Sequence, residues 1–332
     1  MAYMFRFYIS LISLDLSSFK TSLVNNLSYF LLNCILLTSV NLSSFDTSSV
    51  TDMCGMFHNC LSLKSLNLSN FNTSNVDNMS YLFFNCFSLT SLDISNFNTS
   101  SSILLMQMFY NCYSLTSLDL SSFNTKSAIS FVSMFYNCSE LINLNLSNFD
   151  ISSSLGFVSM FYGCNKLVSL DISNFNATNS LYMTDMFYNC SNLQYINIQN
   201  FIENENANFS NIFYGVPDNI VYCSNNDENK PNIIEILKNK SCVFNDCSNN
   251  WKLKRKKILA DNNICLDDCK EDNEYFYEYK NKCYNNCPEG THLLHYIDYL
   301  CIINCPENFP YEKNNECKDF CSGNDFLIKY VE

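Results

Sequence analysis

Glycine, proline, histidine and charged residues are all scarce in this sequence. Its 332 residues include 6 Gly, 5 Pro and 3 His, and only 15% are charged. So few glycines leave no room for a glycine-rich phosphate loop, and neither G-x-x-x-x-G-K nor G-x-G-x-x-G occurs. The net charge of -13 disfavours nucleic acid as the partner, because phosphate binding needs clustered Lys and Arg. With so little His available for catalysis or metal binding, we expect a protein that is not an enzyme and carries no cofactor or metal.

Cysteine, by contrast, is abundant, and its use divides the chain in two. Nineteen cysteines are unusual in a reducing cytosol and ordinary in a secreted protein. Eight of them lie before residue 217 and eleven after it, and the share of charged residues also rises sharply there. With 47% hydrophobic residues the chain has ample material for a core. Two regions with different physical organisation are therefore expected.

The first region is a repeat with a period of 26 residues. Seven cysteines follow one another at that spacing without insertion: Cys34, Cys60, Cys86, Cys112, Cys138, Cys164 and Cys190. Leucine or a similar residue recurs three, six and eight positions after each Cys, and Phe recurs eleven positions after it. A fixed period of this length is the signature of a solenoid, in which stacked copies bury a continuous core.

The spacing predicts a strand and a helix in each coil. Leu66 and Leu68 alternate with polar residues, which is typical of a short strand with its leucines turned inward. Val50, Met53, Phe57 and Cys60 follow helical spacing. The residue before each Cys is always Asn or Gly, the types that best tolerate the left-handed conformation that ends a helix. We therefore expect an α/β repeat solenoid with parallel strands and one helix per coil.

These motifs resemble a known family. L-x-x-L-x-L followed by a helix resembles leucine-rich repeats, and F-x-N-C-x-x-L with S-L-D-L-S-x-F resembles the BspA-type repeats of microbial and protist surface proteins. The resemblance covers residues 4 to about 216 and implies a leucine-rich-repeat-like fold. Phe stands where the commonest leucine-rich consensus places its ladder Asn, so the turn after the strand is expected to be apolar.

The repeat cysteines occupy an apolar position of the repeat, beside Phe and Leu. A metal site needs convergent ligands from several positions rather than one thiol per coil. We expect buried, reduced thiols that act as small hydrophobic residues. Cys54 lies off this column.

Outward strand positions form polar columns that are candidate ligand-binding residues of a concave face. These candidates are Ser65, Asn67, Ser91, Asp93, Ser117, Asp119, Asn143, Asn145, Ser169, Asp171 and Tyr195. Near-identical columns suit a repetitive ligand such as a glycan or a second copy of the chain. A solvated structural ladder of Ser and Asx is the equally weighted alternative, and solvated carboxylates are favoured over a cation at Asp93 and Asp119.

Twelve N-x-S/T sequons occur in the chain. They begin at Asn26, Asn41, Asn67, Asn72, Asn78, Asn98, Asn137, Asn145, Asn176, Asn189, Asn208 and Asn239. Because Asn and Ser are so abundant, many must arise by chance. Asn137 and Asn189 fall on the expected helix ends and should be poor acceptors.

The second region repeats cysteine at a different spacing and predicts disulfides. Its eleven candidates are Cys223, Cys242, Cys247, Cys265, Cys269, Cys283, Cys287, Cys301, Cys305, Cys317 and Cys321. Few apolar residues separate them, so cross-links must replace a core. The C-x-x-x-C-P units resemble furin-like and growth-factor-receptor-like stalks, and zinc is disfavoured because zinc sites prefer C-x-x-C. The spacing does not fix the connectivity, although Cys223–Cys242 is an attractive pair for a bridge at the end of the solenoid.

We expect a solenoid over residues 1–222, with seven full repeats and degenerate end repeats, a cap or linker over 223–260 and a cysteine-rich stalk over 261–332. The basic run Lys252–Lys257 is interpreted as a solvated linker, with a nuclear signal or an anionic-surface patch as the alternative. The odd cysteine count and the lack of a signal peptide favour a fragment of a longer surface protein, with its membrane anchor outside this chain.

The favoured function is non-enzymatic adhesion or recognition at the cell surface or outside the cell. The solenoid face would bind a protein or glycan, with self-association also considered. The alternative is an intracellular protein-interaction scaffold.

Overall fold

A computed structural model of the chain describes residues 1–224, 229–238, 241–244, 247, 257–259, 265–280, 282–294, 300–302, 311–313 and 316–318. These residues form two compact units, Met1–Pro217 with Cys223–Asn239, and Asp218–Tyr222 with Lys240–Glu332. The first is a solenoid of short parallel strands and the second is rich in disulfides. Each is described by itself.

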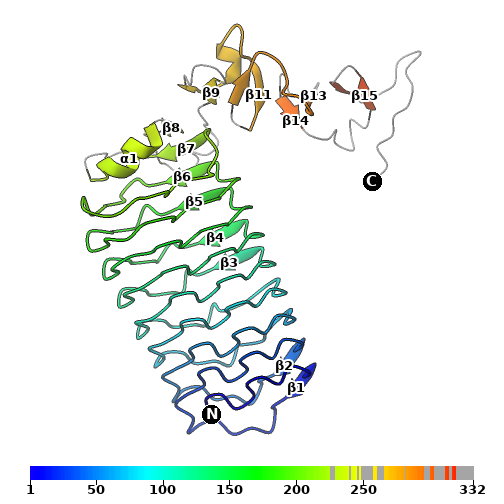
Figure 1. Ribbon diagram of the computed structural model, residues 1–332, viewed down its shortest axis with the longest axis vertical. Coiled ribbons are helices and arrows are strands. Elements are labelled where there is room, and N and C mark those ends of the chain that lie inside the picture. Colours follow the sequence, from blue (N-terminus) through cyan, green and yellow to red (C-terminus); the bar gives the residue numbers. More distant parts are fainter. Residues whose placement is uncertain are drawn as a thin grey trace. The chain divides into compact units, whose positions relative to one another are not determined.

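The solenoid stacks one coil per 26-residue repeat (Figure 1). Its short strands are β1 (Ser13–Asp15), β2 (Ser39–Asn41), β3 (Ser117–Asp119), β4 (Asn143–Asn145), β5 (Ser169–Asp171) and β6 (Tyr195–Asn197). They pair in parallel with a register of one repeat, as in Leu118 beside Leu144. Leu68 is buried while Ser65, Asn67 and Ser69 are exposed, which confirms the predicted alternation.

The prediction of a helix in each coil is wrong. Between Met53 and Cys60, alternate N–H groups donate to the next coil, as in Met53 N to the Asn78 carbonyl at 3.0 Å and Phe57 N to the Leu82 carbonyl at 3.0 Å. The intervening N–H groups close turns within the coil, as in Cys60 N to the Phe57 carbonyl at 3.1 Å. An α-helix would instead use every N–H within its own segment.

The stacking of aromatic rings between coils explains why these segments are not helical. In this segment, rings one repeat apart have centroids as close as 4.5 Å, near the spacing of neighbouring strands. An α-helix with its side chains is about 10 Å wide, so helices on successive coils cannot stack at this distance. The apolar residues predicted to line a helix, such as Val50 and Phe57, still point into the core, where both are fully buried.

Two other predictions for this segment are confirmed. The residue before each repeat Cys has positive φ, from 53° at Asn137 to 69° at Gly163. All eight cysteines of the first region are free and buried. The left-handed residue therefore closes a tight turn rather than a helix.

The solenoid is followed by β7 (Ile220–Cys223) and by α1 (Pro231–Lys238). Glu203, from the last coil, caps the start of this helix, with its carboxylate accepting from Asn232 N at 2.7 Å and Ile233 N at 3.1 Å. A carboxylate at a helix N-terminus satisfies free N–H groups and complements the helix dipole. None of the described helices is long and apolar enough to cross a membrane.

The second unit is a chain of short hairpins. Its strands are β8 (Ser241–Phe244), β9 (Lys257–Leu259), β10 (Cys265–Leu266), β11 (Tyr277–Tyr279), β12 (Lys282–Tyr284), β13 (His292–Leu294), β14 (Leu300–Ile302), β15 (Tyr311–Lys313) and β16 (Glu316–Lys318). Strands β9 to β16 form one sheet in which antiparallel hairpins are joined by parallel contacts.

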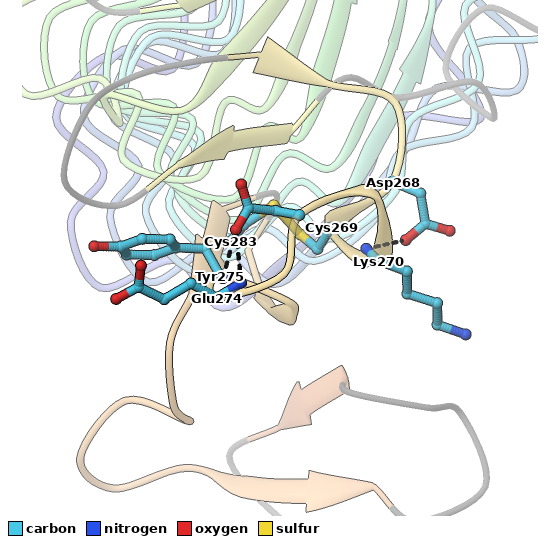
Figure 2. Close-up of a disulfide and its surroundings, with 7 residues drawn as sticks. Asp268, Cys269, Lys270, Glu274, Tyr275 and Cys283 are labelled. Carbon is cyan, nitrogen blue, oxygen red and sulfur yellow. Dashed lines mark hydrogen bonds between the residues drawn. A yellow bond between two sulfur atoms is a disulfide. The ribbon is translucent and has the colours of Figure 1, made fainter.

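Disulfides link the successive hairpins of this unit. Cys269–Cys283 and Cys287–Cys301 each span 14 residues, and Cys242–Cys265 spans 23. Cys269 is 1% exposed and Cys283 0%, so this disulfide, with Leu266 and Tyr275 packed against it, takes the place of a core (Figure 2). The turn between its cysteines is shaped by Asp272, whose Oδ1 accepts from the backbone of Tyr275 at 2.9 Å.

The guessed Cys223–Cys242 bridge is wrong, because Cys242 bonds to Cys265. Cys223 and Cys247 are each disulfide-bonded as well. Cys305, Cys321, the side chain of Cys317 and the basic residues 252–256 lie outside the described residues.

Candidate functional site

The strand face holds the predicted ligand-binding columns. Nine of the eleven residues are exposed, Ser169 is partly exposed and Tyr195 is buried. Tyr195 therefore does not belong to the accessible face. The remaining ten lie in register along the solenoid.

Much of the hydrogen-bonding capacity of this face is used inside the protein. The Oδ1 atom of Asp119 accepts from Ser121 N at 2.9 Å and from Asn145 Nδ2 at 2.9 Å. The same link joins Asn41 to Asp15 at 3.0 Å. In both pairs the Asx side chains close the turns after their strands, and the Asn also donates to the Asp of the preceding coil. These contacts are those of the structural ladder that the sequence left as an alternative.

Asp93 and Asp119 occupy the same column in neighbouring coils. Hydrogen bonds from Ser95 lower the pKa of Asp93, and hydrogen bonds from Ser121 lower that of Asp119. Both carboxylates are therefore ionised and satisfied by their own turns. Over the described part of the chain no cluster of three or more His, Cys, Asp or Glu residues could hold a metal ion.

A second surface, which the sequence reasoning missed, is a column of stacked aromatic rings. It lies two positions before the repeat Cys in five coils and two before Val216 in the last, and we call it the tyrosine ladder: Phe84, Tyr110, Tyr136, Tyr162, Tyr188 and Tyr214. Successive centroids are 4.5 to 4.7 Å apart, and the planes of all but the last pair lie within 9° of parallel. The signal was present in the sequence as the F-Y-N-C motif, which was interpreted as the end of a helix.

The position of the ladder is fixed by the core behind it. The residue before each ladder ring is a buried Phe, and these rings also stack, as Phe109 does on Phe135 at 5.6 Å. The residue after it has positive φ, as at Asn111 and Asn137. Because the backbone path is the same in every coil, each ladder ring emerges at the same point and lies on the ring below.

Stacking determines which part of each ring is accessible. A ring with a neighbour on both sides has its two faces covered, so only its edge and hydroxyl reach solvent. The rings from Phe84 to Tyr188 are accordingly partly exposed, whereas Tyr214 at the end of the ladder is 58% exposed. The ladder therefore presents a row of hydroxyls and ring edges rather than open aromatic faces.

The surroundings of the ladder are uncharged over four consecutive coils. No Asp, Glu, Lys or Arg occurs in residues 80–87, 106–113, 132–139 or 158–165. Burial, followed by the proximity of other tyrosines, raises the pKa of Tyr110 and Tyr136. The hydroxyls are consequently protonated at neutral pH, and those of Tyr110, Tyr136 and Tyr162 interact with one another along the ladder. Asp185 is the first charged residue met along this surface, beside Tyr162 and Tyr188.

The thiol column lies behind this surface and has no access to solvent. Each Sγ donates to the carbonyl 29 residues earlier, as Cys138 does to Phe109 at 3.1 Å. Burial raises the pKa of Cys86, Cys138 and Cys190 to about 12. These protonated thiols are structural, because the nucleophilic and metal-binding form of cysteine is the thiolate.

Comparison with known proteins identifies the repeat region. A family model described as "Mycoplasma protein of unknown function, DUF285" matches residues 1–118, 66–169 and 105–220. Among solved structures, the chain is similar to a leucine-rich repeat protein from Bacteroides ovatus, with 15% identity and a TM-score of 0.30, over 66% of this chain and 63% of that protein. None of the curated proteins matches the chain.

Proposed function

The chain belongs to the DUF285 family, whose members are of unknown function, and from that premise we propose that it is a non-enzymatic recognition protein acting outside the cell. It binds a protein partner through the tyrosine ladder. The observation that carries this proposal is the stack itself, an uncharged row of tyrosine edges held in one position across neighbouring coils.

Tyrosine suits a protein interface because it combines a large apolar area with one hydroxyl. Tyr is enriched among the residues that dominate binding energy, whereas charged residues are depleted at interface centres. Rings already stacked on one another lose little freedom when a partner binds. The ladder therefore has both the chemistry and the rigidity of a binding surface.

The geometry favours a protein over a glycan on this surface. A sugar ring packs against an open aromatic face, and the ladder covers the faces of its inner rings. The edges that remain suit contact with the aromatic and aliphatic side chains of a protein, because ring edges carry the positive part of the quadrupole.

The disulfides support a location outside the cell. Cys242–Cys265, Cys269–Cys283 and Cys287–Cys301 replace a hydrophobic core in the second unit. Bonds of this kind persist in oxidising compartments and are rare in the cytosol. They favour a surface or secreted role over the intracellular scaffold that the sequence left as the alternative.

A non-enzymatic role agrees with the way the polar residues are arranged. The Ser and Asp side chains of the strand face recur coil after coil, and several are already occupied in turn and ladder contacts. Catalysis instead needs a singular group of nucleophile, base and oxyanion donors.

The test is adhesion of beads coated with the full chain to a panel of cell monolayers. We expect the double variant Tyr136→Ser/Tyr162→Ser to reduce adhesion, and the strand-face control Ser91→Ala/Ser117→Ala to leave it unchanged. Mild proteolysis of the cells should abolish adhesion, whereas glycosidase treatment should not. Adhesion that survives the tyrosine variant, or is lost only after glycosidase treatment, would contradict the proposal.

A further inference from the structure

Four exposed aliphatic side chains occupy the same position on successive coils of the solenoid. They lie seven positions before residues of the tyrosine ladder, and we call them the aliphatic column: Ile103, Ile129, Leu155 and Leu181. Their exposed fractions run from 40% to 62%. Single exposed apolar residues are ordinary on a protein surface, whereas a contiguous set of them marks a contact site.

Backbone hydrogen bonds between coils hold the aliphatic column in register. Ile129 N donates to the Ile103 carbonyl at 3.0 Å, and Leu155 N donates to the Ile129 carbonyl at 3.2 Å. Leu181 N donates in turn to the Leu155 carbonyl at 3.0 Å. Parallel segments paired in this way lie about 4.8 Å apart, so the four side chains form one continuous apolar strip. Tyr182, which is 57% exposed, adjoins the strip at its last coil.

The fold does not require an aliphatic residue at this position. In the three preceding coils the same position holds Asn25, Thr51 and Asp77, and all three are exposed. The residue just before it is the one that packs inward, as Ser102 and Ser180 do, both fully buried and each donating through Oγ to a carbonyl of the coil before. The aliphatic side chains therefore serve a contact outside their own coils.

The segments that carry the aliphatic column contain no charged residue. No Asp, Glu, Lys or Arg occurs in residues 101–113, 127–139, 153–165 or 179–184, whereas the whole chain has a net charge of -13. Two copies with this net charge repel one another, and an uncharged aliphatic surface is where they can approach at least cost. Contacts between identical subunits are also richer in apolar groups than other interfaces. Both observations favour a second copy of this chain as the occupant of the column.

The order of residues along the column fits a two-fold axis, about which a surface patch must be complementary to itself. With the axis between Ile129 and Leu155, Ile129 of one copy faces Leu155 of the second copy. The outer pair, Ile103 and Leu181, face each other in the same way. Asp77, which follows next along the column beside Ile103, then lies at opposite ends of the interface in the two copies. Like charges are thus kept apart while every aliphatic side chain meets another.

We propose that two copies of this chain associate through the aliphatic column, with the two columns antiparallel about a two-fold axis. The column spans only four coils, so the contact is smaller than the roughly 800 Å² per subunit of a standard stable interface. The dimer is therefore reversible, with a dissociation constant in the micromolar range. This inference goes beyond the proposed function, because it concerns association of the chain with itself and does not use the tyrosine ladder.

Sedimentation equilibrium of the full chain, from low to several hundred micromolar, measures this association. We expect the average mass to rise with concentration from that of one chain towards that of two. Ile129→Glu should weaken dimerisation by about tenfold or more, because it places a charge against an aliphatic side chain. Ile142→Glu is the matched control, since Ile142 is 43% exposed against 40% for Ile129 and lies outside the column. A parent chain that stays monomeric throughout, or equal weakening by the two variants, would overturn the inference.

Complementary variants test the antiparallel arrangement. Ile129→Glu and Leu155→Lys should each associate weakly alone, and mixing them should restore association because the two introduced charges then face each other. Mixing Ile103→Glu with Ile103→Lys should restore nothing, since these positions lie at opposite ends of the interface. Polar residues at the same position in earlier coils indicate that the solenoid accepts such changes, and urea unfolding of each variant checks this. No recovery in the first mixture, or recovery only in the second, would contradict the proposed dimer.

Discussion

The rings of Tyr136 and Tyr162 lie with centroids 4.5 Å apart and planes 9° from parallel, although 26 residues separate them in sequence. Tyr110 stacks on the opposite side of Tyr136 at the same 4.5 Å. Tyr136 is therefore covered on both faces, so its ring serves the fold and its hydroxyl and edge are what it offers to a partner.

This division of roles predicts different effects for two substitutions at one position. Tyr136→Ala removes two stacking contacts and should lower the free energy of unfolding by about 1–3 kcal/mol. Tyr136→Phe keeps the stack and should change stability by less than about 0.5 kcal/mol. Urea unfolding measures both. Equal stability of the Ala and Phe variants would show that the stack contributes nothing to the fold.

The repeat thiols should resist alkylation in the native protein. Cys112 is fully buried and donates to the Phe83 carbonyl at 3.2 Å, and burial raises its pKa well above the usual range. Reaction needs an exposed thiolate. Cys54 is 8% exposed and should be labelled first among the eight.

The test is to label the thiols before and after addition of denaturant, without reducing agent, and to locate the label by peptide mapping. The disulfide-bonded cysteines of the second unit serve as the internal control, because they should stay unlabelled in both conditions. Rapid labelling of Cys112 in the native chain would contradict the burial of the column.

The same thiols predict a loss of stability in alkali. Burial raises the pKa of Cys138 from 9.0 to about 12, so the unfolded state releases this proton before the folded state does. The stability tied to each thiol is fully present below pH 9 and is lost as the pH rises towards 12. Each such thiol should lower the free energy of unfolding by about 1.4 kcal/mol per pH unit in that window.

Urea unfolding between pH 8 and 11 measures this slope. Cys138→Ala removes one titrating group, so its stability should fall less steeply with pH than that of the parent, although it starts lower because of the cavity. Parallel slopes for variant and parent would show that Cys138 is not the group responsible.

The sequence predicted which residues point into the core better than it predicted the path of the backbone. The 26-residue period placed Val50, Phe57 and Cys60 in the core, where the structure has them. Helical spacing could not reveal that alternate N–H groups between Met53 and Cys60 bond to the next coil, because a turn-rich coil buries the same positions as a helix. Hydrogen bonds between coils depend on stacking, which periodicity within one repeat does not encode.

For the candidate surfaces, too, the sequence predicted which residues are exposed but not the contacts between coils. The strand columns were predicted and are exposed, but their links between coils, such as Asn145 to Asp119, appear only when coils are placed in register. The tyrosine ladder was readable as a column at one phase of the repeat, at Tyr110, Tyr136 and Tyr162. It was missed because a helix would have spread these residues about 10 Å apart rather than stacking them.

A second ladder, of side-chain amides, should carry part of the stability. Asn85 Nδ2 donates to Asn59 Oδ1 at 2.7 Å, and Asn85 Oδ1 accepts from Asn111 Nδ2 at 2.9 Å. Asn85 also has φ of 57°. Asn85→Ala therefore leaves two partners unsatisfied and places Ala in the left-handed region, which together should cost about 2–4 kcal/mol.

A glycine substitution at Asn85 separates the loss of the amide hydrogen bonds from the strain of the left-handed backbone. Asn85→Gly tolerates the positive φ and should recover about 1 kcal/mol relative to Asn85→Ala, with the remaining loss due to the broken ladder. Asn189→Gly is the matched control, since Asn189 has φ of 57° but makes no side-chain ladder bond within the described chain, so its effect on stability should be smaller than that of Asn85→Gly. If urea unfolding gave the same loss for both glycine variants, the amide ladder would not stabilise the solenoid, and the recurrent Asn would be explained by its backbone conformation alone.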